Sequence, residues 1–404
     1  SLAVSAFTSE FRDRIQMQGV QDVANFTPGM TAQDEPDDRL NIRGVGRTTN
    51  TPGSDPGVGI YVDGVYTTNT NAIGSQSLMI DRIEVLRGPQ GTLYGRNTIG
   101  GAVNVISPRP TDEFTGDVRA STGNYDAMMV GAAISGPAGD AVGFRLDAVK
   151  QDRDGYIKNL GPANDLADLD SLDASGQVQW DISERLQLWV RGVYSEYDNA
   201  PDFRVLREQW RNDVFHEGLV IHPWYGYTEV NPAIENPWQI RQDEEQWVKR
   251  DARTLIAHLT YEGDGYTLKY IGGYSDWDWN MHYDGDGIAQ TNPVDNVDLW
   301  GNAWTVPVQG TVDTSDKKDF QSHEIQLLSD TDGRVDWVAG LYYYHEKVDG
   351  DWDWRTPGNE WLMNAYVDAD GAARLVRKRD GAVLNLAPAR PQCRDAAHAR
   401  VSCI

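Results

Sequence analysis

The chain has 404 residues, a formal net charge of −25 and 40% hydrophobic residues. This length is enough for two or three domains, and no apolar run approaches the roughly 18 residues that a membrane-spanning helix needs. The acidic balance excludes nucleic acid as an expected partner, because phosphate binding needs a basic face.

The first 67 residues predict short elements separated by polar loops. Ser9 is expected to cap a helix that starts near Glu10, and a second helix is expected at residues 20–25. Residues 41–45 and 59–65 predict strands, the second with a turn at Asp63-Gly64. The polar segments between these elements are expected to be loops.

Residues 80–108, IDRIEVLRGPQGTLYGRNTIGGAVNVISP, form a compact and glycine-rich stretch. Three strand-like pieces, residues 83–86, 93–94 and 102–106, alternate with glycines that permit tight turns. Charged residues alternate with the apolar ones in the first piece, which indicates a small sheet with one polar face.

This stretch, together with NIRGVG at 41–46 and GIYVDGVY at 59–66, resembles the plug domain of TonB-dependent outer-membrane receptors in both order and spacing. The resemblance implies a mixed α/β plug at residues 1–112 and an all-β membrane barrel from residue 113 to 404. It also implies a place in the outer membrane of a Gram-negative bacterium. The implied partners are the TonB–ExbB–ExbD inner-membrane complex, outer-membrane lipid and a small ligand.

After residue 110, apolar and polar residues alternate with period two, in segments near the roughly 9–11 residues of a tilted membrane strand. The connections alternate between short turns and long polar segments, as in an outer-membrane barrel whose long loops lie outside. About nine strands are expected, whereas a plugged barrel takes roughly 22. An open edge in lipid is costly, so we expect these residues to be the N-terminal part of a longer protein.

Candidate ligand contacts come from two places. The resemblance implies that the polar loops of the plug touch the ligand, which gives Arg47, Asn50, Tyr66, Asn69 and Asn71. In a long segment predicted at residues 277–317, the aromatic cluster of Trp277, Trp279, His282 and Tyr283 could stack on a flat ligand. The alternative for these aromatic residues is loop packing or the girdle at the membrane surface.

A latch between plug and barrel is also implied. In the family, plug arginines pair with barrel glutamates, which singles out Arg43, Glu84 and Arg87 of the plug and Glu324 of the barrel. The alternative is ordinary strand ion pairs without a switching role.

Two further features concern the loops. Cys393 and Cys403 predict a loop-closing disulfide of an oxidising compartment, with two free thiols as the alternative. No cofactor is expected, although the acidic pieces at 276–278 and 284–287 could hold Ca²⁺ if they are not plain solvated turns.

The function implied by the resemblance is TonB-dependent uptake of a scarce ligand, with a ferric siderophore first. A carbohydrate or aromatic nutrient is the alternative within the family. A soluble β-rich glycan-processing enzyme is the alternative from another class. No catalytic motif supports an enzyme.

Overall fold

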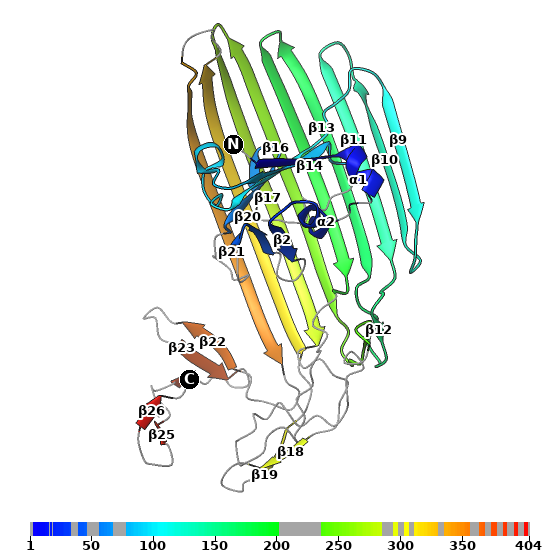
Figure 1. The fold of residues 1–404 in the computed structure, drawn as a ribbon, viewed down its shortest axis with the longest axis vertical. Coiled ribbons are helices and arrows are strands. Elements are labelled where there is room, and N and C mark those ends of the chain that lie inside the picture. The colour runs from blue at the N-terminus through cyan, green and yellow to red at the C-terminus, as the bar shows by residue number, and fades with distance from the viewer. Residues whose placement is uncertain are drawn as a thin grey trace.

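The computed structural model describes the chain except residues 1–2, 16, 18, 34–38, 47–55, 68–77, 202–235, 285–293, 298–302, 307–310, 330–334, 356–362, 368–372, 378–382, 386–391, 395–399 and 403–404. Two parts stand out in Figure 1: a small α/β domain that ends at residue 106, and a large antiparallel sheet, here called the wall. No helix in the described residues is long and apolar enough to cross a membrane.

The described residues of the small domain, here called the N-terminal domain, form two sheets and three short helices. Its larger sheet has the order β1-β7-β8-β5-β6, and its smaller sheet the order β2-β3-β4. The elements are β1 (Ala3–Thr8), α1 (Ser9–Ile15), α2 (Val20–Asn25), β2 (Met30–Gln33), β3 (Arg39–Ile42), β4 (Val45–Gly46), β5 (Val58–Val62), β6 (Val65–Thr67), β7 (Arg82–Arg87), α4 (Gly91–Tyr94) and β8 (Gly101–Ile106).

Both predicted helices are confirmed, but three local predictions were wrong. The cap of α1 is Thr8, whose Oγ1 accepts a hydrogen bond from Phe11 N at 3.3 Å, and not Ser9. Strand β1 was missed, because its partner β7 lies far along the chain and no local pattern reveals the pairing. Residues 93–94 belong to α4, a single helical turn that ends at Gly95 with φ 74°.

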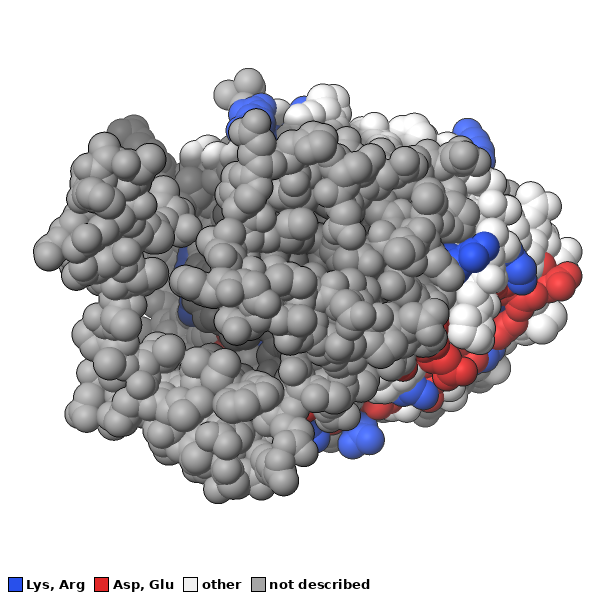
Figure 2. All heavy atoms as spheres, turned by 90° about the horizontal axis from the view of Figure 1, so that it is seen from below, with Lys and Arg blue, Asp and Glu red and all other residues white. Residues whose placement is uncertain are grey.

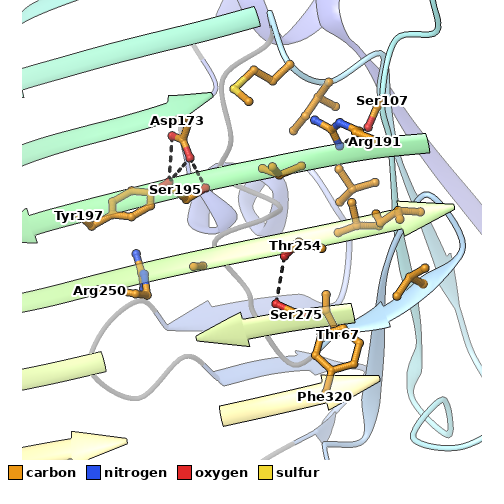
Figure 3. Close-up of a pocket in the computed structure, with 18 residues that line it drawn as sticks. Thr67, Ser107, Asp173, Arg191, Ser195, Tyr197, Arg250, Thr254, Ser275 and Phe320 are labelled. Carbon is orange, nitrogen blue, oxygen red and sulfur yellow. Dashed lines mark hydrogen bonds between the residues drawn. The ribbon is translucent and has the colours of Figure 1, made fainter. Parts of the chain in front are cut away.

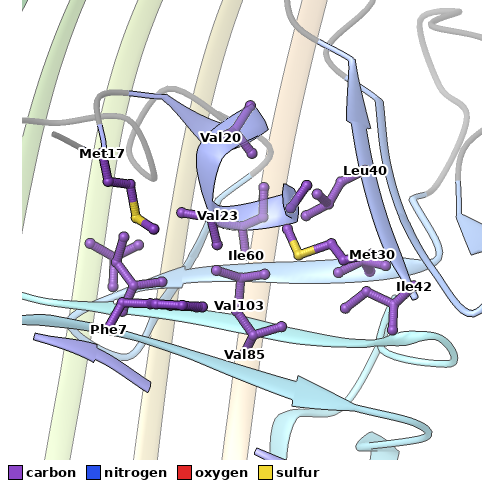
Figure 4. Close-up of a cluster of buried hydrophobic side chains, with 14 of the residues drawn as sticks. Phe7, Met17, Val20, Val23, Met30, Leu40, Ile42, Ile60, Val85 and Val103 are labelled. Carbon is purple, nitrogen blue, oxygen red and sulfur yellow. The ribbon is translucent and has the colours of Figure 1, made fainter. Parts of the chain in front are cut away.

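The core of the N-terminal domain lies between α2 and the larger sheet (Figure 4). Val23 of α2 is fully buried, as are Ile83, Val85 and Val103 of the sheet. Burial of each such side chain stabilises the fold by about 1.5–3 kcal/mol. This core keeps the sheet rigid enough to present its turns to the wall.

In the part of the chain that the structure describes, the wall consists of nine strands in sequence order, each antiparallel to its neighbours, in agreement with the prediction of about nine. They are β9 (Thr115–Thr122), β10 (Met128–Pro137), β11 (Val142–Arg153), β13 (Leu169–Ser183), β14 (Leu186–Asn199), β16 (Trp247–Gly263), β17 (Tyr266–Asp284), β20 (Thr311–Ser329) and β21 (Val338–Arg355). Short additional strands pair outside the wall: β12 (Lys158–Asn159), β15 (Gln239–Ile240), β18 (Val294–Val297), β19 (Ala303–Val306), β22 (Met363–Val367), β23 (Ala373–Arg377), β24 (Val383–Asn385), β25 (Gln392–Arg394) and β26 (Arg400–Ser402).

The two rims of the wall differ, as the sequence predicted. The connections between strands are residues 138–141, 184–185, 264–265 and 330–337 on one rim, and 123–127, 154–168, 200–246 and 285–310 on the other. The second rim, here called the loop rim, lies at the bottom of Figure 1. Figure 2, seen from that end, shows acidic and basic side chains close together at the right-hand side of the molecule.

The strands extend further toward the loop rim than predicted. Strand β17 continues to Asp284, and its pairing with β20 continues to the register Asp284↔Thr311. Residues 277–284 are therefore strand, not loop. Polar side chains do not end a ladder, because its hydrogen bonds come from the backbone.

The two faces of the wall have opposite character. One face exposes apolar side chains, among them Val118 (80% exposed), Leu146 (53%) and Leu255 (50%). The N-terminal domain lies against the other face, where Gln177 and Arg191 are buried. An exposed apolar band on one face with polar residues on the other is typical of a membrane barrel.

Candidate functional site

The turn between β5 and β6 connects the N-terminal domain to the wall. Asp63 and Gly64 both have positive φ, 48° and 83°, as a tight hairpin turn requires. The Asp63 carboxylate accepts hydrogen bonds from Ser107 N at 2.9 Å and from Ser107 Oγ at 2.5 Å. Arg191 Nη1 of β14 lies 3.2 Å from Asp63 Oδ2, and both side chains are buried. A buried carboxylate in this setting needs a charged partner, and the wall supplies it.

The segment after β8 makes a second set of polar contacts. His258 Nε2 lies 2.7 Å from the Asp63 carbonyl oxygen, which can only accept, so Nε2 carries the proton. The other ring nitrogen, Nδ1, then accepts from Arg109 Nη2 at 3.4 Å. The Arg109 guanidinium also lies 3.5 Å above the ring of Trp189. Burial lowers the pKa of Arg109, and the nearby Asp63 carboxylate opposes that shift.

Two further wall residues bind backbone carbonyls, one in the N-terminal domain and one in the segment that follows it. Gln177 Nε2 donates to the Pro108 carbonyl at 2.9 Å, and Gln177 Oε1 accepts from the Trp189 indole at 3.0 Å. Arg145 donates to the Leu78 carbonyl at 2.8 Å. Contacts to carbonyl oxygens depend on backbone position, so they set the register of the docked domain.

An aromatic cluster forms another contact. Tyr61, Tyr66 and Tyr94 of the N-terminal domain pack together, and Tyr66 contacts Tyr344 of β21 with ring centroids 5.7 Å apart. The Arg96 guanidinium lies 5.0 Å above the Tyr344 ring. The Tyr61 hydroxyl donates to the Tyr94 carbonyl, and burial raises the pKa of Tyr61.

Between these contacts lies a cavity of about 80 Å³, large enough for several water molecules. The N-terminal domain contributes a mostly apolar side, whereas the wall contributes a polar ladder (Figure 3). In that ladder, Asp173 accepts hydrogen bonds from Ser195 at 2.6 Å and Tyr197 at 3.1 Å. The Arg250 guanidinium lies 4.3 Å from the centre of the Tyr197 ring. The cavity therefore lies between the apolar surface of the N-terminal domain and the polar inner face of the wall.

The comparisons with known proteins identify this arrangement. Residues 1–102 match the family model of the TonB-dependent Receptor Plug Domain. The chain is 27% identical to the ferripyoverdine receptor of Pseudomonas aeruginosa over 246 residues, which is 56% of this chain and 28% of that protein. It is 33% identical to the pesticin receptor of Yersinia enterocolitica over 156 residues, 38% of this chain and 22% of that protein. Residues 1–102 are therefore a TonB-dependent receptor plug domain.

Solved receptors share the fold at low sequence identity. The ferric yersiniabactin uptake receptor of Yersinia pestis superposes with a TM-score of 0.68 at 17% identity, covering 88% of this chain and 50% of the other. The alignments with the two curated relatives span about a quarter of each relative's length. These matches confirm the predicted plug with membrane-barrel strands and place the receptor in the Gram-negative outer membrane.

The predicted ligand contacts of this receptor lie in different environments. Tyr66 is 3% exposed in the aromatic cluster, where its hydroxyl accepts a hydrogen bond from Asn97 at 2.9 Å. The other predicted contacts in the plug loops lie outside the described residues: Arg47, Asn50, Asn69 and Asn71.

The predicted aromatic cluster on β17 is divided between the two faces of the wall. Because side chains alternate along a strand, Trp277, Trp279 and Tyr283 share the inner face. His282 lies on the outer face, where its Nδ1 is 2.7 Å from Asp313 Oδ1 and its ring stacks on Trp247. The prediction that His282 joins Trp279 and Tyr283 in one site was therefore wrong.

The predicted latch residues make other contacts. Arg87 donates to the Pro28 carbonyl at 3.2 Å, and Glu84 pairs with Arg82 of its own strand at 2.7 Å. Glu324 accepts a hydrogen bond from Gln326. Arg43 is exposed. In the described residues no ion pair joins Arg43 or Arg87 to Glu324.

Two ion pairs among the described residues join the plug to the wall instead, with the acid on the plug. They are Asp63–Arg191 at 3.2 Å and the more exposed Asp13–Arg119 at 2.6 Å. The sequence contains a pattern that could have identified Arg191. An arginine on the inward face of a strand with alternating apolar and polar residues needs an acidic partner. Trp189, which interrupts the polar set of the same strand, is the 1% exposed ring beneath Arg109.

The remaining predictions fall partly outside the described residues. The side chains of Cys393 and Cys403 are among those not described, as are residues 285–287 of the second acidic piece. The first acidic piece lies on β17, where Asp278 pairs with Lys317 at 3.1 Å. Among the described residues, no group of three or more His, Cys, Asp or Glu side chains could hold a metal ion.

Proposed function

We propose that this receptor takes up a ferric siderophore across the outer membrane in a TonB-dependent manner. The observation that carries the proposal is the plug domain docked on the polar inner face of the wall by a buried ion pair. A folded domain in that position obstructs passage along the wall, so transport requires that it rearrange. The relatives support the ligand class, because they are named as ferripyoverdine, pesticin and ferric enterobactin receptors.

The proposed partner is the TonB–ExbB–ExbD complex, which would supply the energy for this rearrangement. The polar contacts between plug and wall suit such a role. A small displacement of the plug from the wall breaks each of them, while the core of the N-terminal domain stays intact. The role proposed for the chain is binding and transport rather than catalysis.

The test is uptake of radioactive iron by iron-starved cells that carry the full-length receptor as their sole siderophore receptor. Catecholate, hydroxamate and phenolate chelates would be supplied in turn, in cells with and without TonB. We expect uptake of one chelate class, abolished without TonB. Uptake of none of the chelates, together with TonB-dependent uptake of an oligosaccharide or aromatic nutrient, would overturn the siderophore assignment and retain the family.

A further inference from the structure

His258 of β16 lies between two parts of the chain that precede the wall. Its Nε2 donates to the Asp63 carbonyl at 2.7 Å, and its Nδ1 accepts from Arg109 Nη2 at 3.4 Å. The first contact holds the β5–β6 turn, and the second holds the segment that follows β8. A guanidinium can only donate, so Nδ1 accepts from Arg109 only while this nitrogen carries no proton. The docked structure therefore contains a neutral imidazole.

Positive charge lies close to this ring. The Arg109 guanidinium lies 3.5 Å above the Trp189 ring, whose centroid is 4.9 Å from that of the His258 ring. The indole that would stabilise a charged imidazole therefore already stabilises one cation. Lys269 of β17 adds a further positive charge that acts on His258.

The nearby acid does not offset this repulsion. The Asp63 carboxylate already accepts two hydrogen bonds from Ser107 and pairs with Arg191. His258 reaches the backbone carbonyl of Asp63 and not its carboxylate, and Arg109 acts on the ring more strongly than Asp63 does. A proton added at Nδ1 would point at the Arg109 guanidinium and break the contact there. Protonation of His258 therefore acts against the docked position.

We propose that His258 is a proton-sensitive contact that weakens the docking of the plug as its surroundings become acidic. The docked ring is neutral, whereas a ring released from Arg109 takes up a proton within the ordinary histidine range of about pH 5–8. Since release is coupled to proton uptake, docking should weaken as the pH falls through this range. Arg109 is exposed, so the pair is accessible to protons from solvent. The proposal rests on the docked plug and not on the ligand that is transported.

Two variants separate the proton from the contact. His258→Gln keeps an amide donor near the position of Nε2, which can still reach the Asp63 carbonyl, but it takes up no proton. Arg109→Gln keeps a donor to Nδ1 and removes the positive charge that opposes protonation. The matched control is His323→Gln, because His323 lies on the outer face of β20, where its Nδ1 is 2.8 Å from the Tyr270 hydroxyl.

The experiment is hydrogen exchange of the full-length receptor in detergent at about pH 5.5 and about pH 8, corrected for the intrinsic pH dependence of amide exchange. In the unsubstituted receptor, residues 58–67 should exchange roughly tenfold faster at the lower pH, while the wall strands keep their protection. His258→Gln and Arg109→Gln should each reduce this ratio to less than about threefold, and His323→Gln should keep it. Equal exchange of all variants at the higher pH would show that each of them folds and docks.

A full pH dependence in His258→Gln would overturn the proposal, because another group would then carry it. A full pH dependence in Arg109→Gln would do the same, because the guanidinium would then play no part. If His258→Gln is already undocked at the higher pH, the Arg109 variant decides: a reduced ratio supports the proposal and a retained one overturns it. Failure of siderophore uptake would overturn the assignment of the ligand and leave each of these outcomes unchanged.

Discussion

Arg191 of β14 and Asp63 of the β5–β6 turn form the buried ion pair that joins the plug to the wall, with 3.2 Å between nitrogen and oxygen. Their side chains are 5% and 0% exposed, so neither charge lies in contact with bulk water. Ser107 completes the arrangement by donating two hydrogen bonds to the same carboxylate. The docked position of the plug therefore depends on an acidic residue of the plug, Asp63, and a basic residue of the wall, Arg191.

Replacing Arg191 by Met should loosen the docked plug. The substitution leaves the Asp63 carboxylate buried without its charged partner, which costs about 3–5 kcal/mol. Hydrogen exchange of amides in residues 58–67 should accelerate, while the amides of the wall strands keep their protection. The control is Arg119→Gln, which breaks the exposed pair with Asp13 and should cost less than about 1 kcal/mol. Equal effects of the two variants would show that the buried pair does not hold the plug.

The sequence predicted the plug, the nine strands and the two unlike rims, because alternation and glycine turns are local signals. It could not predict which inward charges meet, because Asp63 and Arg191 are 128 residues apart. It also misplaced His282, because the strand was expected to end before that residue. Once β17 is seen to continue, alternation alone assigns His282 to the outer face.

Gly273 permits the close approach of the plug to β17. A Cβ atom at this position would lie 2.3 Å from Val65 Cγ1. Gly273→Val should therefore displace the β5–β6 turn and destabilise docking by about 1–3 kcal/mol, measured by the same hydrogen exchange. Gly192→Ala, where the added atom meets nothing within 4 Å, should leave the exchange of the plug unchanged. Unchanged exchange in Gly273→Val would mean that the turn is not in contact with the wall.

Tyr61 should make the plug sensitive to alkaline pH. Burial raises the pKa of its phenol, so in the folded state the phenol stays protonated and donates its hydrogen bond to the Tyr94 carbonyl. In the unfolded chain a tyrosine ionises near about pH 10, so stability should fall as the pH rises above that value. Tyr61→Phe should cost about 1–2 kcal/mol at neutral pH, because one buried hydrogen bond is lost.

The measurement is denaturant unfolding of the plug, followed by hydrogen exchange, at pH 7, 9 and 11. Tyr61→Phe should show a shallower decline above pH 10 than the unsubstituted receptor. A decline of equal steepness in both would assign the alkaline sensitivity to other groups.

Asp243 should destabilise its loop segment at neutral pH. Both carboxylate oxygens are buried without a hydrogen-bond partner among the described residues. Burial, and then the neighbouring Glu244, raise the pKa of Asp243 above its ordinary 3.8. A raised carboxyl pKa means that the folded state favours the proton, so stability should increase as the pH falls from neutral toward 3.8.

Asp243→Asn removes this charge, and should stabilise residues 236–246 at pH 7 by less than about 1 kcal/mol, because water screens a partly buried group. Slower proteolysis of this segment would report the effect. The exposed neighbour provides the control, since Glu245→Gln should change nothing. Faster proteolysis of Asp243→Asn would indicate that the carboxylate has a stabilising partner.

The division of the β17 aromatic residues between two faces gives a direct test of where the ligand binds. Trp277 and Trp279 stack on the inner face with ring centroids 6.4 Å apart, and Lys318 Nζ lies 5.2 Å from the Trp277 ring. If the ferric chelate enters along the inner wall, Trp277→Leu and Trp279→Leu should each weaken its binding roughly tenfold, because a large stacking surface is lost.

His282→Ala should leave chelate affinity unchanged, because this ring lies on the opposite face, against Trp247 and Asp313. Titration of tryptophan fluorescence with the chelate, supported by calorimetry, measures all three variants on the same receptor. Weaker binding in His282→Ala alone would place the chelate outside the wall and contradict an inner binding site. Unchanged affinity in all three variants would instead assign recognition to the plug, where the ligand would meet residues of the β5–β6 region before it reached β17.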